Sequence, residues 1–248
     1  MRPDFRISIL LLSILPLVAT AEDTEWLVAP YGWLPAVSVD QTFDDDAGGG
    51  EGTGGAEVLS KVDFVAMLRT EVARGHWGAM LDYIYISLAD QTTLSPLPVI
   101  DIGIDGDLDL EVLELGGFYR ISGDASGIDL LLGLRRIEVD LGIVFSREGI
   151  PPRPLDVAAE IDDVFLGARY RLPLSDQWDI TLRGDYGFGD SDGTVNVIAG
   201  VGLAFNDTFG MKLGYRYANI EFEQELEGSP EKTEILLAGP FVGLLLRF

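Results

Sequence analysis

The sequence predicts an all-β protein, a transmembrane, up-and-down, antiparallel β-barrel of about ten strands. Apolar and charged residues alternate with a period of two along most of the chain, which is typical of strands and not of helices. After residue 21, no window contains the roughly 18 consecutive apolar residues that a transmembrane helix requires. The chain nevertheless ends in an apolar strand, Val242–Phe248, although its formal net charge is −24. A soluble β-sandwich also alternates, so further features must separate the two folds.

Residues 1–21 have the organisation of a cleavable signal peptide. Two arginines give a basic start, residues 7–18 form an apolar segment, and Ala19-Thr20-Ala21 supplies small residues where signal peptidase cleaves. A membrane anchor is the alternative, but the apolar segment is too short to span a bilayer and contains a proline. We therefore expect export by a cleaved signal peptide, followed by one outer-membrane β-barrel domain over residues 22–248.

Ten segments carry the alternation, and most are long enough for a tilted membrane crossing of about 9–11 residues. Near the C-terminus, for example, Phe209 and Leu213 share one face while Lys212 lies on the other. The expected strands are residues 25–40, 58–73, 76–89, 102–120, 127–146, 157–172, 177–189, 194–206, 208–223 and 233–248. Apparent changes of phase predict β-bulges at three points: Val112–Leu113, Asp162–Asp163 and Tyr217–Ala218.

The lengths of the connections favour the barrel over the sandwich. The short set comprises residues 74–75, 122–126, 173–176 and 206–207. The mostly longer set comprises residues 41–57, 90–101, 147–156 and 224–232, with 189–193 as a short exception. Outer-membrane barrels have short periplasmic turns and longer external loops, so we expect the first set in the periplasm and the second outside the cell.

Aromatic residues gather at the expected strand ends, where membrane barrels carry girdles at the two lipid–water interfaces. They are Trp26, Tyr31, Trp33, Trp77, Tyr119, Tyr170, Trp178, Phe205 and Phe209. The strands also have an apolar face that no predicted helix covers. Lipid is the expected cover for this face.

The apolar C-terminus fits the closing strand of such a barrel. Val242, Leu244, Leu246 and Phe248 fall on the expected lipid-facing side, and Arg247 faces inward. A terminal phenylalanine with apolar residues at every second position before it resembles the signal that the outer-membrane barrel-assembly machinery recognises. Phe248 is therefore the expected assembly signal.

Several segments resemble an uncharacterised family of Gram-negative outer-membrane β-barrel proteins. They are APYGWLPAVSVD (29–40), DFVAMLRTEVARGHWGAMLDYIYISL (63–88), ELGGFYR (114–120), FLGARYRLPLSDQW (165–178), LGYRYANIEFE (213–223) and GPFVGLLLRF (239–248). The resemblance covers nearly the whole mature chain. It implies the barrel fold and the outer membrane, and it supplies no catalytic motif.

His76 is the single histidine and the main candidate for catalysis. Outer-membrane proteases of the omptin type, which also have ten strands, need a His–Asp pair and an Asp pair at the external rim. Counting strands from a periplasmic N-terminus puts His76 in the first periplasmic turn, at the opposite end, where an interfacial position beside Trp77 is the expected role. We expect no catalytic residues and no cofactor.

Acidic clusters fall in the expected external loops. Weak candidates for divalent-cation ligands are Asp44, Asp45, Asp46, Asp190 and Asp192. The segment that begins at Asp190 lacks the third acidic position and the closing glutamate of a calcium loop, so a solvated acidic rim is the stronger interpretation. The negative charge excludes nucleic acid as a partner. Outer-membrane lipid, lipopolysaccharide, the barrel-assembly machinery and divalent cations at the loops are the expected partners.

Charges of both signs are expected to face the barrel interior. They are Arg69, Glu71, Asp82, Arg169, Arg171, Arg183, Asp185, Lys212 and Arg216. They either form ion pairs that fill the lumen or line a narrow path for ions. Inward-facing Met67, Met80, Phe165 and Phe241 favour filling. We therefore expect a non-enzymatic barrel with a structural or surface-interaction role; a small-solute pore and, more remotely, an enzyme are the alternatives.

Overall fold

The computed structural model describes residues 24–43, 52–58, 62–97, 100–122, 126–147, 150–226 and 229–248. The expected signal peptide lies outside these residues. Within the described ranges there are strands and turns only, and no helix there is long and apolar enough to cross a membrane.

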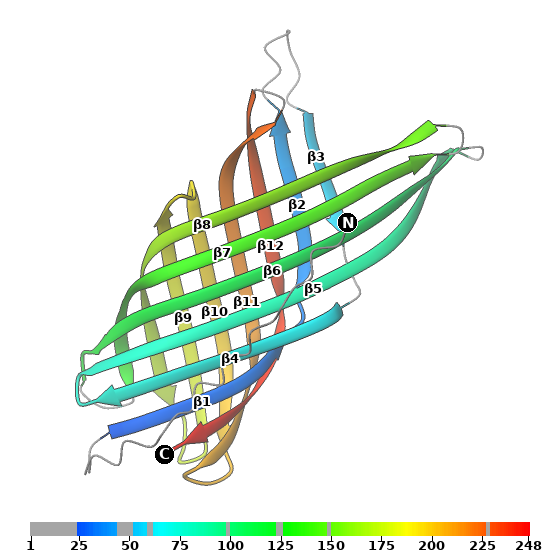
Figure 1. Cartoon of the computed structure of the whole chain (residues 1–248). Coiled ribbons are helices and arrows are strands. Elements are labelled where there is room, and N and C mark those ends of the chain that lie inside the picture. Colours follow the sequence, from blue (N-terminus) through cyan, green and yellow to red (C-terminus); the bar gives the residue numbers. More distant parts are fainter. Residues whose placement is uncertain are drawn as a thin grey trace, which may run out of the picture.

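The chain forms one antiparallel sheet that closes on itself (Figure 1). Its strands are β1 (Thr24–Trp33), β2 (Ala36–Phe43), β3 (Gly52–Val58), β4 (Val62–Arg74), β5 (Trp77–Leu97), β6 (Ile100–Arg120), β7 (Gly127–Arg147), β8 (Ile150–Pro173), β9 (Trp178–Gly189), β10 (Gly193–Ala204), β11 (Phe209–Leu226) and β12 (Ser229–Arg247). The barrel consists of β1 and β4–β12, and pairing of β1 with β12 closes it. The predicted ten-stranded antiparallel barrel is confirmed.

The first expected strand is divided in two. β1 and β2 are separated by Leu34 and Pro35, because proline has no N–H to donate to a strand ladder. β2 continues alongside β12, and β3 pairs back onto β2 as a hairpin. The additional strands thus belong to an extension of the ten-stranded barrel.

Both ends of the described chain and the short connections lie at one end of the barrel, here called the turn end (Figure 1). β1 and the C-terminus meet there through two backbone hydrogen bonds between Trp26 and Phe248, at 3.0 and 3.1 Å. The first turn reverses the chain over Gly75 and His76, and Gly75 has a φ of 57°, which glycine adopts without strain. The opposite end is called the far end.

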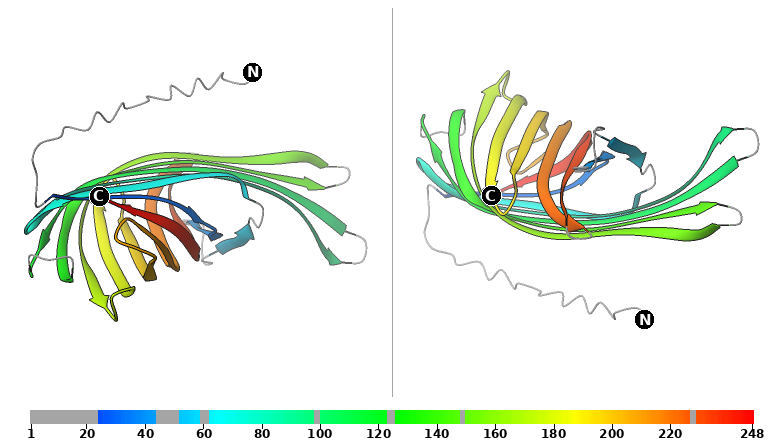
Figure 2. Two further views of the ribbon diagram at one scale, coloured as in Figure 1. Left: turned by 90° about the horizontal axis from the view of Figure 1, so that it is seen from below. Right: turned by 90° about the horizontal axis from the view of Figure 1, so that it is seen from above.

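At the far end the strands continue beyond the closed cylinder. β8 pairs with β9 only from Asp163 onward, and its outer part, Ile150–Asp162, pairs with β7. On the other side, β5 pairs with β4 only up to Leu88. Its pairing with β6, on the opposite edge, continues to Leu97. The outer parts of β5–β8 therefore leave the cylinder together as a four-stranded sheet, which runs off to one side (Figure 2).

Most of the expected external loops are strand residues, so this part of the prediction is wrong. β5 extends to Leu97 and β6 begins at Ile100. Likewise, β7 extends to Arg147 and β8 begins at Ile150. Similarly, β11 and β12 continue through most of the expected loop at residues 224–232. The prolines and polar residues of these segments are typical of loops, but their backbones continue the pairing of the neighbouring strands.

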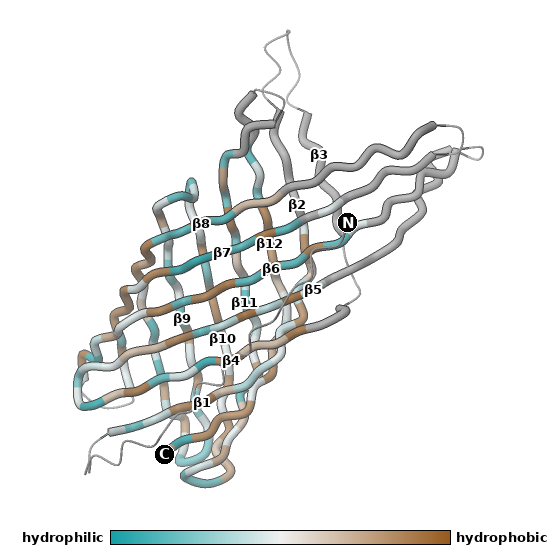
Figure 3. Tube along the Cα trace, in the orientation of Figure 1, coloured by the Kyte–Doolittle hydropathy of each residue, from teal (hydrophilic) through white to brown (hydrophobic). Residues whose placement is uncertain are grey.

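Hydrophobic and hydrophilic residues alternate along the described strands (Figure 3), and the exterior changes character from one end of the strands to the other. Near the turn end, outward-facing side chains are large, apolar and exposed, for example Leu132 at 58% and Leu166 at 60%. Farther along, outward-facing side chains are acidic, as at Glu138, Asp140 and Glu160. We call the first part the barrel region. The second part, called the extension, comprises β2, β3 and residues 84–97, 100–112, 136–147, 150–162, 218–226 and 229–238.

The interior changes in the opposite sense. Where the structure describes the inward side chains of the extension, most are apolar, and together with two residues of the adjoining barrel region they form one buried cluster, the outer core, in which the sheet of β5–β8 packs against β11, β12 and β2. Its members are Trp33, Val37, Met67, Ile84, Ile86, Leu108, Leu110, Val112, Ile137, Val139, Ile161, Ile220, Phe222, Ile235 and Leu237. The extension is thus apolar inside and acidic outside, as in a water-soluble β-sandwich.

The three predicted β-bulges are absent from the described strands. The register is continuous through Val112↔Ile137 and Leu113↔Arg136, and equally through Asp162 and Tyr217. Inward and outward positions keep alternating, and only the polarity of the two faces is exchanged. The expected bulges were therefore wrong: the change of phase in the sequence marks the boundary between the barrel region and the extension.

Aromatic side chains flank the apolar belt. At the turn end, the exposed group contains Trp26, Trp77, Tyr119, Tyr170, Trp178, Phe205 and Phe209. At the other edge of the belt, the exposed group contains Tyr186, Phe188 and Tyr217. Two of the expected girdle residues are instead inside the barrel: Tyr31 donates a hydrogen bond to Asp82, and Trp33 is 1% exposed. Both lie at odd positions of β1, which face inward.

The C-terminal strand has the expected orientation. Val242, Leu244 and Phe248 are 50%, 58% and 69% exposed on the outer surface. Arg247 lies on the opposite face, at the interior mouth of the turn end.

Candidate functional site

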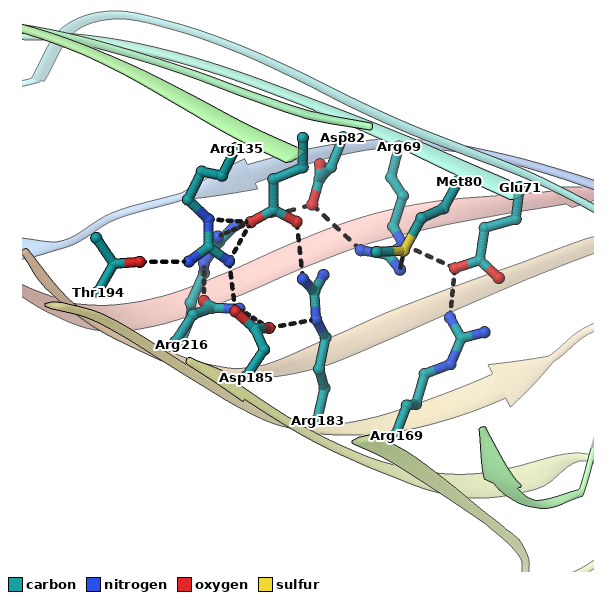
Figure 4. Close-up of polar contacts among 12 residues, drawn as sticks. Arg69, Glu71, Met80, Asp82, Arg135, Arg169, Arg183, Asp185, Thr194 and Arg216 are labelled. Atoms are coloured by element: carbon teal, nitrogen blue, oxygen red, sulfur yellow. Dashed lines mark hydrogen bonds and ion pairs between the residues drawn. The ribbon is translucent and has the colours of Figure 1, made fainter. Parts of the chain in front are cut away.

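The interior of the barrel region holds a continuous ion-pair network (Figure 4). Strands β4–β9 and β11 supply it, because alternate residues of each point inward. Its cations are Arg69, Arg135, Arg169, Arg171, Arg183 and Arg216, and its anions are Glu71, Asp82, Glu114, Asp129 and Asp185. Eight of the nine predicted lumen charges belong to this network, and the ninth, Lys212, lies beside it.

Glu114 is the centre of the part nearest the extension. Its side chain is fully buried and accepts hydrogen bonds from Arg135 at 2.7 Å and from Arg183 at 2.8 Å. Arg216 approaches the same carboxylate at 3.7 Å. Asp185 binds Arg135 and Arg183 from the other side. Each buried charge therefore has opposite charges in contact, which a buried ion needs in order to be tolerated.

A second group of pairs lies toward the turn end. Glu71 accepts hydrogen bonds from Arg69 at 2.8 Å and Arg169 at 2.5 Å. Asp129 accepts from Arg169 at 2.8 Å and from Arg171 at 2.9 Å. Asp82 joins the two groups, because it lies 3.2 Å from Arg69 and 3.9 Å from Arg216.

Aromatic rings pack against the arginines of the network. Arg135 and Arg183 lie over the Phe165 ring, with their guanidinium carbons 5.1 and 5.6 Å from its centroid. Arg216 lies over Trp33 at 5.1 Å. These contacts fix the planar guanidinium groups in position and reduce the space left for water.

The sequence prediction omitted Glu114, Asp129 and Arg135, the partners that complete the network. The signal that could have identified them is strict alternation. Glu114 falls at every second position with the inward Phe118 and Arg120, and Asp129 and Arg135 do so with the inward Leu131 and Ile137.

The network closes the interior on the far-end side, and the outer core lies directly beyond it. A small void of about 20 Å³ lies between Arg135, Arg216 and the adjoining residues of the outer core. Trp33 belongs to both parts, since its ring covers Arg216 and its side chain packs in the outer core. Among the residues that the structure describes, the lumen is thus filled at this level.

Toward the turn end the lumen is hollow. An inner cavity of about 110 Å³ is bounded by the network on one side and by apolar residues of β1, β10 and β12 on the other. It adjoins two wider spaces of about 530 and 440 Å³ at the turn end, here called the vestibule. Leu27 and Arg171 line all three spaces, so the inner cavity and the vestibule adjoin at these two side chains.

His76 is engaged at the turn end. Its Nδ1 lies 2.6 Å from the backbone oxygen of Arg120, and its ring stacks on Tyr119 with the centroids 5.5 Å apart. The ring of Trp77 also contacts Tyr119, edge to face. This arrangement suits an interfacial position.

The weak metal candidates do not form a site in the described part of the chain. Asp190 and Asp192 are exposed in the turn between β9 and β10, and Asp190 accepts a hydrogen bond from the backbone N–H of Asp162. Asp44, Asp45 and Asp46 lie outside the described residues. Over the described ranges, no group of three or more acidic or histidine residues is placed to hold a metal ion.

No protein-family model and no curated protein matches this sequence. Among solved structures, the chain is similar to the outer membrane protease OmpT from Escherichia coli, with 11% identity, a TM-score of 0.55, and 92% of this chain and 98% of that chain covered. It also aligns with the translocator domain of the autotransporter NalP from Neisseria meningitidis (13% identity, 91% and 88% covered, TM-score 0.44). The outer membrane protein OprG from Pseudomonas aeruginosa aligns at 13% identity, with 91% and 96% covered and a TM-score of 0.34. The similarity to OmpT shows the fold of an outer-membrane β-barrel and nothing about activity.

Proposed function

We propose that this chain is a non-conducting, non-enzymatic protein of a Gram-negative outer membrane, which holds an acidic β-sandwich at the cell surface. The observation that carries the proposal is the exchange of polarity along the strands that continue into the extension, β5–β8, β11 and β12. An exposed apolar belt suits lipid, and an acidic exterior over an apolar core suits water. The extension would therefore stand outside the membrane, and the turn end, which carries both ends of the described chain, would face the periplasm. The sequence resemblance to an outer-membrane family supports the same location.

The filled interior supports a surface role over a pore. An ion path needs a continuous aqueous passage, whereas the ion-pair network and the outer core occupy the lumen between the cavity and the far end. The position of His76 supports the non-enzymatic part, because its ring nitrogen contacts a backbone carbonyl at the turn end.

The outer face of the extension suits a cationic partner. Glu111, Glu138 and Glu160 are direct neighbours across β6, β7 and β8, and Asp109 faces Asp140. Like charges opposite one another destabilise a sheet, and Arg136 neutralises only part of this row through Glu138, Glu160 and Asp162. Divalent cations held between this face and lipopolysaccharide phosphates would relieve the repulsion.

Conductance of the purified, refolded protein in a planar bilayer tests the central claim. We expect no channel steps with the wild-type protein. Steps whose ion selectivity changes in an Arg69→Ala variant would establish the pore alternative instead.

Surface labelling tests the orientation. A cysteine introduced at Asp192 or Pro151 should react with a membrane-impermeant reagent on intact cells, and one at Ser175 should react only after lysis. The reverse pattern would invert the barrel and place His76 at the cell surface.

We also propose that Phe248 is the assembly signal. Its side chain is 69% exposed at the end of the lipid-facing row of β12. Deletion of Phe248 should lower the amount of barrel inserted in the outer membrane while export continues. Wild-type levels of inserted protein would show that the signal lies elsewhere.

A further inference from the structure

The inner cavity carries more positive charge than its own carboxylates neutralise. The ion-pair network has six arginines and five carboxylates, and Lys212 adds a further cation at the cavity wall. The vestibule does not share this excess, because Arg120 and Arg247 line it together with Glu25, Asp176, Asp179 and Asp207. This local excess occurs in a chain whose formal net charge is −24.

The excess is accompanied by unused hydrogen-bond donors. Arg183 lines the cavity with a side chain that is 2% exposed, and its Nη1 is buried without a hydrogen-bond partner. Lys212 has three N–H donors, and its Nζ donates to Thr181 at 2.8 Å. Within the described residues Lys212 makes no ion pair. A buried guanidinium nitrogen without a partner is costly, and an anion in the cavity would satisfy it.

The opposite wall of the same cavity is apolar. Leu27 and Ala29 of β1, Ile198 of β10, and Phe241 and Leu245 of β12 face the charged wall. Leu27 and Leu245 continue into the vestibule. A ligand entering from the turn end would therefore meet cations on one side and hydrocarbon on the other.

We propose that the inner cavity binds a small anionic amphiphile, a carboxylate or phosphate head group on a short alkyl chain, which enters through the vestibule. The head group lies between Arg183 and Lys212, and the alkyl chain lies along Leu27 and Leu245. This binding site is independent of the acidic extension and of the proposed surface role, since it opens at the other end of the barrel.

Calorimetric titration of the full mature barrel in nanodiscs of zwitterionic lipid tests the proposal, with empty nanodiscs as the blank. The probes are octanoate and octyl phosphate, compared with octanol, octylamine and inorganic phosphate. We expect the two anionic amphiphiles to bind at least tenfold more tightly than any of the other three. Equal binding of octanol would show a merely apolar pocket, and equal binding of inorganic phosphate would show an anion site without an alkyl subsite; either result overturns the proposal.

The variant Lys212→Met removes one cation without breaking an ion pair of the described network. It should weaken octanoate binding about tenfold to 100-fold, the effect of losing one charge-assisted hydrogen bond. Lys232→Gln, which removes the same charge from the exposed outer face, is the matched control and should leave binding unchanged. Unchanged binding in Lys212→Met would overturn the site. If that variant does not fold, the comparison of octanoate with octanol on the wild-type protein still decides the question.

Discussion

On strand β7, Leu132 and Asp140 both point outward, but Leu132 belongs to the apolar belt of the barrel region and Asp140 to the acidic face of the extension. Their inward neighbours show the reverse, since Arg135 is part of the ion-pair network and Ile137 is part of the outer core. One uninterrupted strand thus has opposite arrangements of polar and apolar side chains in the two regions. The difference between them is the medium that covers the exterior.

The comparison shows how the medium determines the interior. In the barrel region, lipid accepts the apolar side chains, so the core can be built from ions provided that every ion is paired. In the proposed arrangement water covers the exterior of the extension, so the apolar side chains must be inside. The pleat of the strand is the same in both regions, and four predictions follow from treating the two separately.

The largest effect is expected from Glu114→Gln in the barrel region. This change leaves Arg135, Arg183 and Arg216 facing a neutral amide, and breaking a buried ion pair costs about 3–5 kcal/mol. The urea midpoint of the refolded barrel measures it. Glu160→Gln, on the exposed face of the extension, is the control and should change stability by less than about 0.5 kcal/mol. Equal effects of the two variants would mean that water reaches Glu114.

Ile137→Ala tests the outer core in the same way. Ile137 is 1% exposed, and truncation of such a side chain in a packed core costs about 2–5 kcal/mol. The loss should be confined to the extension, so protease cleavage at the far end should accelerate while the barrel region stays resistant. An unchanged cleavage rate would show that the two sheets of the extension do not pack tightly.

Leu132→Lys places a charge in the middle of the lipid-facing belt. A lysine at the bilayer midplane of a β-barrel costs about 2–4 kcal/mol, falling toward the interfaces. The measurement is the free energy of unfolding in lipid bilayers, and repeating it for lysine at Leu130 and Leu134 maps the depth. A flat profile along β7 would contradict the assignment of the belt.

Asp140→Lys, at the same parity on the same strand, should have the smallest effect. In water this change should alter stability by less than about 0.5 kcal/mol, and in the stabilising direction, because Asp140 lies opposite Asp109. A loss as large as that of Leu132→Lys would place Asp140 in lipid and remove the boundary between the two regions.

Much of the fold could be predicted because a membrane barrel is specified by local patterns. Alternation identified the ten strands, the short turns identified one end, and the row from Val242 to Phe248 identified the outward face of the closing strand. The inward orientation of Arg69, Glu71 and Asp82 could be predicted from the alternation with their apolar neighbours alone. Their partners did not: Arg169 meets Glu71 from a strand 98 residues away, and such a pairing depends on the curvature of the closed sheet.

The sequence by itself determined that ten strands form the barrel, the lipid-facing side of most of their barrel-region segments, and the places where polarity changes. Only the tertiary structure decided what that change means. A period of two describes the pleat but does not say which medium covers either face, so an exchange of faces and a bulge give the same pattern. Once β5–β8 are seen to leave the cylinder and pack on β11 and β12, the apolar residues beyond Val112 acquire a covering sheet. In the adjoining barrel region, the inward charges form ion pairs across the closed sheet. The two regions are therefore distinct.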